Sequence, residues 1–330
     1  MGNIIVIGAG QAGQSLVTKL RNLGHDGAIT LIGAEAQPPY QRPPLSKKYL
    51  LGDMELDRMF LRPESFYGEH DITLKLGMGV TSIDPAAKTV TLGDESIPYD
   101  QLALTTGSIP HQLPAKIGGD LGGVYTVRTL ADADALEPEF QPGRKVLIVG
   151  GGYIGLEAAA VAARKGLNVT LVEMADRILQ RVAAPETSDF IRAAHVAEGV
   201  DIREGVRLDH LSGTDRVTAA TLTDGTELPV DFVIVGVGIR PDIELAESAG
   251  LDTDNGIKTD NHGQTSDPSI WAAGDCASFI FNGNRIRLES VGNAIDQAEL
   301  VAENMLGAEK SYVVKPWFWS DQFELKLQIA

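Results

Sequence analysis

The sequence predicts an α/β protein with two Rossmann-like, three-layer units, the second inserted in the first. A glycine-rich fingerprint occurs twice, each time between a short apolar segment and a helical pattern. The segments after each fingerprint repeat one order of strand, polar turn, strand and buried strand. The last third of the chain supplies a strand and a helix that complete the first unit. With 330 residues the chain can hold two or three domains.

The first unit opens with Ile4–Ile7, a continuous apolar run typical of a parallel strand buried on both faces. Three glycines follow in the spacing G-x-G-x-x-G: Gly8, Gly10 and Gly13. A helix with one leucine-rich face comes next and ends near Gly24, and a second apolar strand ends near Glu35. Such glycines permit a tight turn and let a pyrophosphate approach the helix N-terminus, while the acid can accept from ribose hydroxyls. In this context the fingerprint predicts nucleotide binding rather than a tight turn alone.

The same pattern recurs from Val146–Val149, which reads as the strand of the second unit. Its fingerprint glycines are Gly150, Gly152 and Gly155. The helix ends at Gly166 and the next strand ends at Glu173. Two copies of this architecture need two dinucleotides.

Two short segments predict where the chain crosses between the units. Both Gly107–Pro110 and Gly238–Pro241 follow a buried strand and end on proline, so hinges are expected there. Beyond the second hinge, Ile270–Ala273 reads as a short strand of the first unit, with Asp275 just after it. An acid at that position can bind a ribityl hydroxyl or orient a pyrophosphate. A helix N-cap is an equally good reading of Asp275.

Composition excludes several other classes of protein. A net charge of −17 argues against general nucleic-acid binding. The single cysteine, Cys276, excludes a disulfide framework and a C-x-x-C redox pair, and the six histidines show no ligand spacing, so no metal is expected. No apolar run is long enough for a membrane span, and the N-terminus reads as a buried strand rather than a signal peptide. A cytoplasmic setting is therefore expected.

Together these segments resemble the FAD-dependent pyridine-nucleotide disulfide oxidoreductases, and among them the ferredoxin reductases of bacterial oxygenase systems. The resemblance covers essentially the whole chain and is carried by motifs that include "GAGQAG", "RPPLSKKYL", "GGGYIGLE", "TSDPSIWAAGDCA" and "PWFWSDQFELKLQIA". It implies a glutathione-reductase-like fold. It places FAD on residues 1–110 and 239–316 and NADH on residues 111–238, and makes residues 317–330 the beginning of a C-terminal α/β interface domain.

The resemblance also carries over site residues one by one. The FAD contacts fall on Gly8, Gly10, Ala12, Gly13, Glu35, Lys47, Val80, Arg128, Asp275, Val291 and Trp319. The NADH contacts fall on Gly150, Gly152, Tyr153, Ile154, Gly155, Glu157, Glu173 and Gly238. In many relatives an acid follows the strand-end glycine directly, where this chain has Ala34. Glu35 is expected to serve the adenosine ribose instead, or the contact is weaker.

The stretch "RPPLSKKYL" raises the question of why a lysine is held so rigidly near a dinucleotide. Pro43 and Pro44 restrict the backbone just before it. The resemblance places Lys47 beside the flavin N5 edge and Glu157 opposite, and a buried ammonium needs such a counter-charge. These two residues are the predicted catalytic pair. The alternative is a solvated surface lysine, which suits Lys48 better.

Two further features bear on the cofactors. A helix expected to begin near Gly292 would direct its N-terminus at the flavin N1–C2 edge, where its dipole favours negative charge, although ordinary packing also explains its apolar face. An acid at Glu173 favours NADH over NADPH because it repels a 2′-phosphate. Arg177 and Arg181, further along the loop, argue the other way.

The resemblance implies hydride transfer from NADH to FAD and single-electron transfer to a [2Fe–2S] ferredoxin that feeds a cytochrome P450 or other oxygenase. The chain is expected to act as a monomer or homodimer. An NADH oxidase, a peroxidase or a rubredoxin reductase is an alternative, but the peroxidases usually carry a redox cysteine where this chain has Ser46. A redox-switched interaction protein like apoptosis-inducing factor is another.

The last residues, "FELKLQIA", alternate apolar and polar side chains from Phe323 to Ile329 and predict a half-buried strand. A strand cannot stand alone, and relatives continue into a third domain of which only the beginning is present. Exposed apolar surface, altered oligomerisation and a truncated chain are the alternatives that this leaves open. Trp317 and Trp319 are expected near the flavin and the docking surface.

Overall fold

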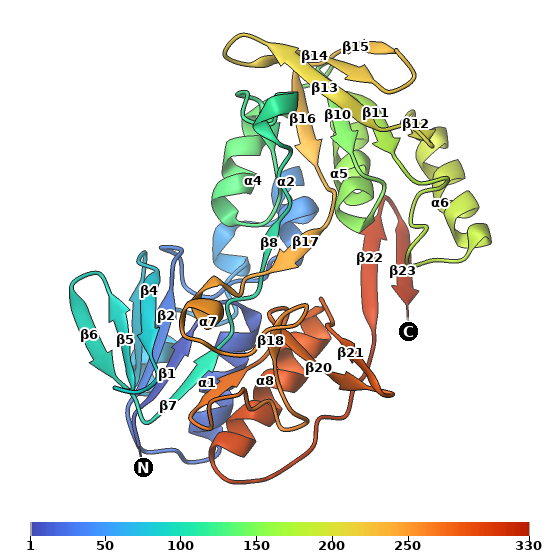
Figure 1. Cartoon of the computed structure of the whole chain (residues 1–330). Coiled ribbons are helices and arrows are strands. Elements are labelled where there is room, and N and C mark those ends of the chain that lie inside the picture. The colour runs from blue at the N-terminus through green and yellow to red at the C-terminus, as the bar shows by residue number, and fades with distance from the viewer. Residues whose placement is uncertain (1, 330) are drawn as a thin grey trace.

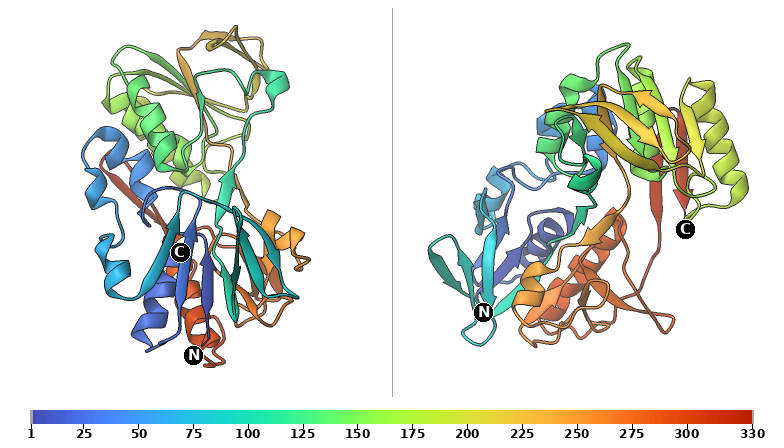
Figure 2. Two further views of the ribbon diagram at one scale, coloured as in Figure 1. Left: turned by 90° about the vertical axis from the view of Figure 1, so that its left-hand side faces the viewer. Right: turned by 45° about the horizontal axis from the view of Figure 1, so that its top comes forward.

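A computed structural model describes residues 2–329, which form two lobes (Figure 1). Besides the inserted segment itself, the short helix α2 (Lys48–Leu51) and the C-terminal residues also lie in the second lobe. Each lobe is built on a five-stranded parallel sheet, and two further views keep the lobes distinct (Figure 2). The strands of the first sheet, in spatial order, are β19 (Ile270–Ala272), β7 (Gln101–Leu104), β1 (Ile4–Ile7), β2 (Ile29–Gly33) and β3 (Ile72–Leu76). Because β19 comes from beyond the second lobe, the second lobe is an insertion.

The first sheet has a different layer on each face. Helices α1 (Gln11–Asn22) and α8 (Val291–Met305) pack side by side against one face. The antiparallel meander β4 (Val80–Asp84), β5 (Thr89–Leu92) and β6 (Glu95–Pro98) covers the other. Apolar runs of strands such as β1 and β2 are fully buried because both faces are covered.

The second lobe repeats these layers. Its sheet has the order β12 (Asp201–Glu204), β11 (Asn168–Glu173), β10 (Lys145–Val149), β16 (Phe232–Val235) and β9 (Val124–Tyr125). The helices α4 (Leu130–Leu136), α5 (Tyr153–Arg164) and α6 (Pro185–Ala197) belong to one core. The meander β13 (Leu208–Gly213), β14 (Val217–Leu222) and β15 (Glu227–Pro229) covers the opposite face. The predicted fold class of two three-layer units, one inserted in the other, is confirmed.

Short elements complete the structure. They are η1 (Pro43–Ser46), α2 (Lys48–Leu51), η2 (Leu56–Arg58), α3 (Ser65–Glu69), η3 (Ala115–Ile117), η4 (Glu137–Glu139), α7 (Glu244–Ser248), β18 (Ile257–Lys258), β20 (Ala277–Phe281) and β21 (Asn284–Ile286). Between residues 2 and 329, no helix is both long and apolar enough to cross a membrane.

The two crossings that bound the inserted segment lie side by side. Strand β8 (Ser108–Pro110) leaves the first lobe and β17 (Ile239–Pro241) returns to it, and the two pair antiparallel. At the far end of this ribbon the His111 N–H donates to the Gly238 carbonyl at 3.0 Å. The positions predicted as hinges are therefore where the chain crosses.

The C-terminal residues form a hairpin of β22 (Phe318–Gln322) and β23 (Leu325–Ile329). The observed strand begins two residues later than predicted. Phe323, which has a φ of 53°, and Glu324 form the turn instead. The hairpin lies against α5, and Leu325 and Leu327 pack on the core of the second lobe (Figure 1). The apolar side chains of this face are partly buried against the second lobe, so among the alternatives the exposed apolar surface is at most partial.

Candidate functional site

A cavity of about 1600 Å³ lies between the lobes. Both glycine fingerprints, Lys47, Glu157 and the hairpin contribute to its walls. Pockets for one small ligand usually measure about 300–1,000 Å³, so this cavity has room for more than one such ligand.

The first fingerprint forms a cradle that side chains would fill. Gly8 has a φ of 112°, and a Cβ there would lie 2.1 Å from the Thr105 carbonyl oxygen. A Cβ on Gly13 would lie 2.0 Å from the Gly8 carbonyl oxygen, so helix α1 packs directly on the turn. Gly10, the N-cap of α1, has nothing within 4 Å of its Cβ position and borders the cavity. The outer glycines thus make the turn, while the middle one keeps space open.

The second fingerprint repeats this geometry. Gly150 has a φ of 109°, and its Cβ would lie 2.4 Å from the Gly236 carbonyl oxygen. A Cβ on Gly155 would lie 2.0 Å from the Gly150 carbonyl oxygen, and Gly152 again faces open space. Neither Gly10 nor Gly152 has a side chain that caps its helix, so the first N–H groups of α1 and α5 are available to anions. Both cradles therefore fit the pyrophosphate of a dinucleotide.

An acid stands beside each cradle, and each is held differently. Glu35 pairs with Arg42 at 2.6 Å and accepts from the Tyr40 hydroxyl. Burial raises the pKa of Tyr40, so this hydroxyl stays a donor. Glu173 accepts from the backbone N–H groups of Gly151 at 2.6 Å and Ala175 at 2.8 Å. Both carboxylates border the cavity.

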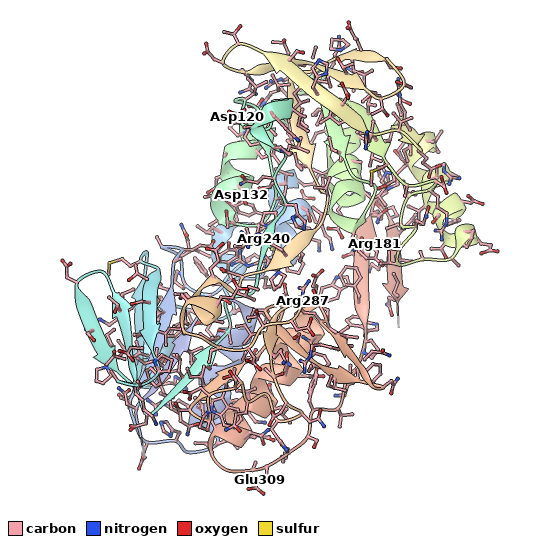
Figure 3. All side chains as sticks on the ribbon, in the orientation of Figure 1. Asp120, Asp132, Arg181, Arg240, Arg287 and Glu309 are labelled. Atoms are coloured by element: carbon pink, nitrogen blue, oxygen red, sulfur yellow. The ribbon has the colours of Figure 1, made fainter. Side chains whose placement is uncertain are left out.

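The arginines that follow Glu173 have different surroundings. Arg177 donates to the Ser188 hydroxyl at 2.6 Å and to the Gln180 carbonyl, which turns its charge toward α6. Arg181, labelled in Figure 3, is exposed and lines the cavity from the same loop. Both arginines line the cavity, so both remain arguments against a preference for NADH, although Arg177 is held by Ser188 and Gln180.

The predicted pair meets in the cavity wall. Lys47 Nζ lies 3.0 Å from Glu157 Oε1, with side-chain exposures of 13% and 3%. Lys47 follows η1, whose first turn holds the two prolines, and Glu157 lies in the second turn of α5. The pair therefore joins a segment from the N-terminal part of the chain to α5 of the second lobe, on which this segment packs, and Lys47 is not a solvated surface lysine. Lys48 is exposed, as expected.

Two serines that the sequence did not reveal complete the environment of Glu157. Ser46 donates to Oε2 and Ser320 donates to Oε1, both at 2.7 Å. Burial raises the pKa of Glu157, while Lys47 and the two hydroxyls act in the opposite direction. Ser46 could have been suspected as the neighbour of Lys47. Ser320 had no local signal, because it lies 163 positions from its partner.

The two tryptophans of the C-terminal segment lie at the same place. Trp319 has its ring centroid 5.9 Å from Lys47 Nζ, a cation–π geometry. Trp317 stacks on Trp319 with ring centroids 5.3 Å apart and is 43% exposed. The hairpin thus brings a stacked aromatic pair from the cavity to the surface.

Asp275 faces the cavity after β19, where it accepts from the Ser108 hydroxyl at 2.9 Å and lies 3.4 Å from Arg128 Nη2. The N-cap reading of Asp275 is wrong, since a turn and β20 follow it. Arg128 belongs to the inserted segment but reaches across to the first lobe. Burial lowers the pKa of the Arg128 guanidinium and Asp275 opposes this effect.

Helix α8 begins at Val291, one residue earlier than expected, and Ser290 caps it by accepting from the Asn293 N–H at 3.2 Å. Its N-terminus borders the cavity. The other predicted contacts that line the cavity are Ala12, Val80, Tyr153, Ile154 and Gly238. The sequence missed Gln297, whose amide oxygen accepts from the Gly274 N–H and ties α8 to the turn before Asp275.

Two glycine cradles that open on one shared cavity define a fold suited to bind two dinucleotides. Residues 2–298 match the family described as pyridine nucleotide-disulphide oxidoreductase, and the chain belongs to this family. Among curated proteins it is similar to a ferredoxin–NAD(P)(+) reductase of Sphingomonas sp., with 45% identity over 99% of this chain and 80% of the relative. It is also 40% identical to putidaredoxin reductase of Pseudomonas putida, over 99% of this chain and 80% of that protein.

Solved structures agree. The putidaredoxin reductase chain of a covalent putidaredoxin reductase–putidaredoxin complex superposes with a TM-score of 0.96 at 40% identity, over 99% of this chain and 80% of that one. The ferredoxin reductase of the CYP199A2 system from Rhodopseudomonas palustris superposes with a TM-score of 0.93 at 40% identity, over 99% of this chain and 81% of that one.

Proposed function

We propose that this protein is an NADH-dependent flavoprotein reductase that delivers electrons singly to a [2Fe–2S] ferredoxin of an oxygenase system. The observation that carries the proposal is the Lys47–Glu157 pair, which lies in the wall of the cavity that two glycine-lined helix N-termini share. When bound, FAD would accept a hydride from the nicotinamide and release electrons one at a time, a chemistry that no side chain supplies.

The proposed division of the chain follows the two cradles. Residues 1–110 and 239–316 hold FAD, through the first cradle and Asp275, and residues 111–238 hold NADH. Residues 317–330 belong to an interface region, which the stacked tryptophans support. Arg128 is the exception, because it serves the FAD side from within the inserted segment.

Two positive features act on the bound ring. The Lys47 ammonium faces the cavity from one side, and the N-terminus of α8 faces it from another. Both favour negative charge on a ring that receives hydride. Glu157 holds Lys47 in place and also registers the nicotinamide-binding lobe against the flavin-binding lobe. No side chain has to move a proton for hydride transfer; position and field suffice.

The preference for NADH is proposed from Glu173. Its carboxylate is fixed by two backbone N–H groups at the mouth of the second cradle. A fixed acid accepts from the 2′ and 3′ hydroxyls of NADH and repels a 2′-phosphate. Arg181 weakens this repulsion only if it turns toward the same ribose.

The proposed acceptor is a ferredoxin because several relatives at 40–45% identity carry names of ferredoxin reductases or of putidaredoxin and rhodocoxin reductase. A rubredoxin is the second candidate, since a rubredoxin–NAD(+) reductase of Pseudomonas putida is 38% identical over 98% of this chain. The test is NADH-dependent cytochrome c reduction by the FAD-loaded chain, with a [2Fe–2S] ferredoxin, with a rubredoxin and with neither. Strong stimulation by the ferredoxin alone is expected. Equal rates in all three mixtures would contradict the proposal.

The remaining alternatives predict other outcomes. An NADH peroxidase needs a reactive cysteine, but Cys276 is fully buried and burial raises the pKa of its thiol. Peroxide consumption coupled to NADH would nevertheless favour that reading. A redox-switched interaction protein like apoptosis-inducing factor would instead form a long-lived complex with NADH and reduce no carrier.

A further inference from the structure

A buried chain of hydrogen bonds leads away from Glu157 into the hairpin. Ser320 donates to Glu157 Oε1 at 2.7 Å, Gln322 Nε2 donates to Ser320 Oγ at 3.1 Å, and Gln322 Oε1 contacts His195 Nε2 at 2.9 Å. These four side chains are at most 3% exposed. Ser320 and Gln322 lie two residues apart on β22, so their side chains share one face of the strand. His195 comes from α6.

The chemistry of the groups gives this chain one direction. An ionised carboxylate only accepts, so the single hydroxyl proton of Ser320 points to Glu157. Ser320 must then accept from the amide nitrogen of Gln322, which leaves the amide oxygen to accept from His195 Nε2–H. His195 therefore carries a proton on Nε2, and the neutral ring is favoured because burial lowers the pKa of His195. Its Nδ1 has no partner among the described residues.

A competing carboxylate makes the orientation of Glu157 matter. Asp321 Oδ2 lies 3.8 Å from Lys47 Nζ and its side chain is 45% exposed. If Glu157 takes up a proton, Lys47 loses its buried partner and is drawn toward Asp321, at the solvent side. Every donor that keeps Glu157 ionised therefore keeps Lys47 facing the cavity.

We infer that Ser320, Gln322 and His195 are positioning residues that hold Glu157 ionised and aimed at Lys47, so that the C-terminal hairpin is part of the redox site. The positioning of Glu157 does not depend on the proposed function, whereas its effect on flavin reduction does. A neutral amide in the middle rules out a proton wire, and the chain acts by orientation and polarisation.

The first test needs no turnover. The carboxyl carbon of Glu157 is followed by ¹³C NMR against pH in the full FAD-loaded chain, and in Ser320→Ala and Gln322→Met. Glu157 should ionise at higher pH in Ser320→Ala than in the unmodified protein, and by a smaller margin in Gln322→Met. Nitrogen-15 spectra should show His195 as the Nε2–H tautomer between about pH 5 and 8. A His195 that protonates in this range, or an unchanged Glu157 titration, would overturn the inference.

The second test measures flavin bleaching by NADH in a stopped-flow instrument over the same pH range. A lost hydrogen bond to a charged group corresponds to roughly tenfold, so Ser320→Ala should be about tenfold slower at low pH and should recover as pH rises. Leu327→Ala is the control, because Leu327 lies opposite Ser320 in the hairpin and packs on the core without joining the chain. Its profile should keep the pH dependence of the unmodified protein.

The two arms separate the possible failures. A uniform loss of rate at all pH values in Ser320→Ala, matched by Leu327→Ala, means that the hairpin is merely structural and the inference is wrong. If NADH bleaches no flavin even in the unmodified protein, the proposed function fails, and the NMR arm alone decides whether the chain positions Glu157.

Discussion

Replacing Lys47 by methionine removes the ammonium and keeps an unbranched side chain in its place. The variant should fold and retain FAD, since Lys47 adds charge rather than bulk to the cavity wall. It should reduce its flavin more slowly. A unit charge about 4 Å from another contributes about 4 kcal/mol at an effective dielectric constant near 20, so losing only a third of that slows hydride transfer about tenfold.

The same substitution should lower stability, because Glu157 is 3% exposed and loses its counter-charge. Removing one partner of a buried pair typically costs about 3–5 kcal/mol, and the lower end is expected here since the hydroxyls of Ser46 and Ser320 still donate. The free energy of unfolding in denaturant measures this loss.

The loss should depend on pH in a definite direction. Burial already raises the pKa of Glu157, and removing Lys47 removes an opposing influence. Glu157 therefore favours the folded state when protonated, and this contribution is lost as pH rises through its folded-state pKa. The variant should be closest to the unmodified protein in acid and furthest from it at alkaline pH.

Lys48→Met is the matched control, because Lys48 is adjacent and exposed. A second variant, Lys47→Met with Glu157→Gln, removes the buried charge but keeps an amide for Ser46 and Ser320, so it should recover stability and not rate. The assay is anaerobic stopped-flow bleaching of the flavin by NADH. An unchanged rate in FAD-loaded Lys47→Met would refute the electrostatic role and reduce the loop to a structural clamp.

The purified protein should be yellow and hold one FAD, and a colourless chain that no FAD titration reconstitutes would contradict this. Gly10→Ala should fold, since nothing lies within 4 Å of its Cβ position, but the variant should no longer bind FAD. Gly152→Ala should still bind FAD but should have a higher KM for NADH. Gly68→Ala is the control for both variants, because its Cβ position also faces open space. Loss of FAD in Gly152→Ala and a raised KM for NADH in Gly10→Ala would show that the first lobe binds NADH and the second binds FAD. Glu173→Ala should narrow the preference for NADH over NADPH by roughly 1–3 kcal/mol in kcat/KM, and equal use of both by the unmodified protein would already rule out the assigned role.

Features with a local physical cause could be predicted from the sequence. Strand β1 was predicted with its observed bounds, because a buried parallel strand needs a continuous apolar run. The fingerprint glycines were predictable for a similar reason, since Gly13 and Gly155 occupy places where a Cβ meets a backbone carbonyl. Lys47 and Glu157 came together only through the family resemblance.

The missing parts of the site depend on contacts between distant segments. His195 and Gln322 are 127 positions apart, and each alone reads as an ordinary polar residue of a helix or strand. The N-cap reading of Asp275 failed because a turn there leads into β20 rather than a helix. The start of β23 was misplaced because alternation continues through Phe323, whose left-handed backbone breaks the strand.

The ribbon of β8 and β17 brings the two ends of the inserted segment together. Pro110 and Ile239 are direct neighbours across the ribbon, so a tight turn of two residues can reconnect them after residues 111–238 are excised. The shortened chain would keep all five strands of the first sheet in one covalent order. The excision would also remove the surface on which Leu50, Leu325 and Leu327 pack, so a lobe that replaces residues 111–238 must supply an apolar face for them.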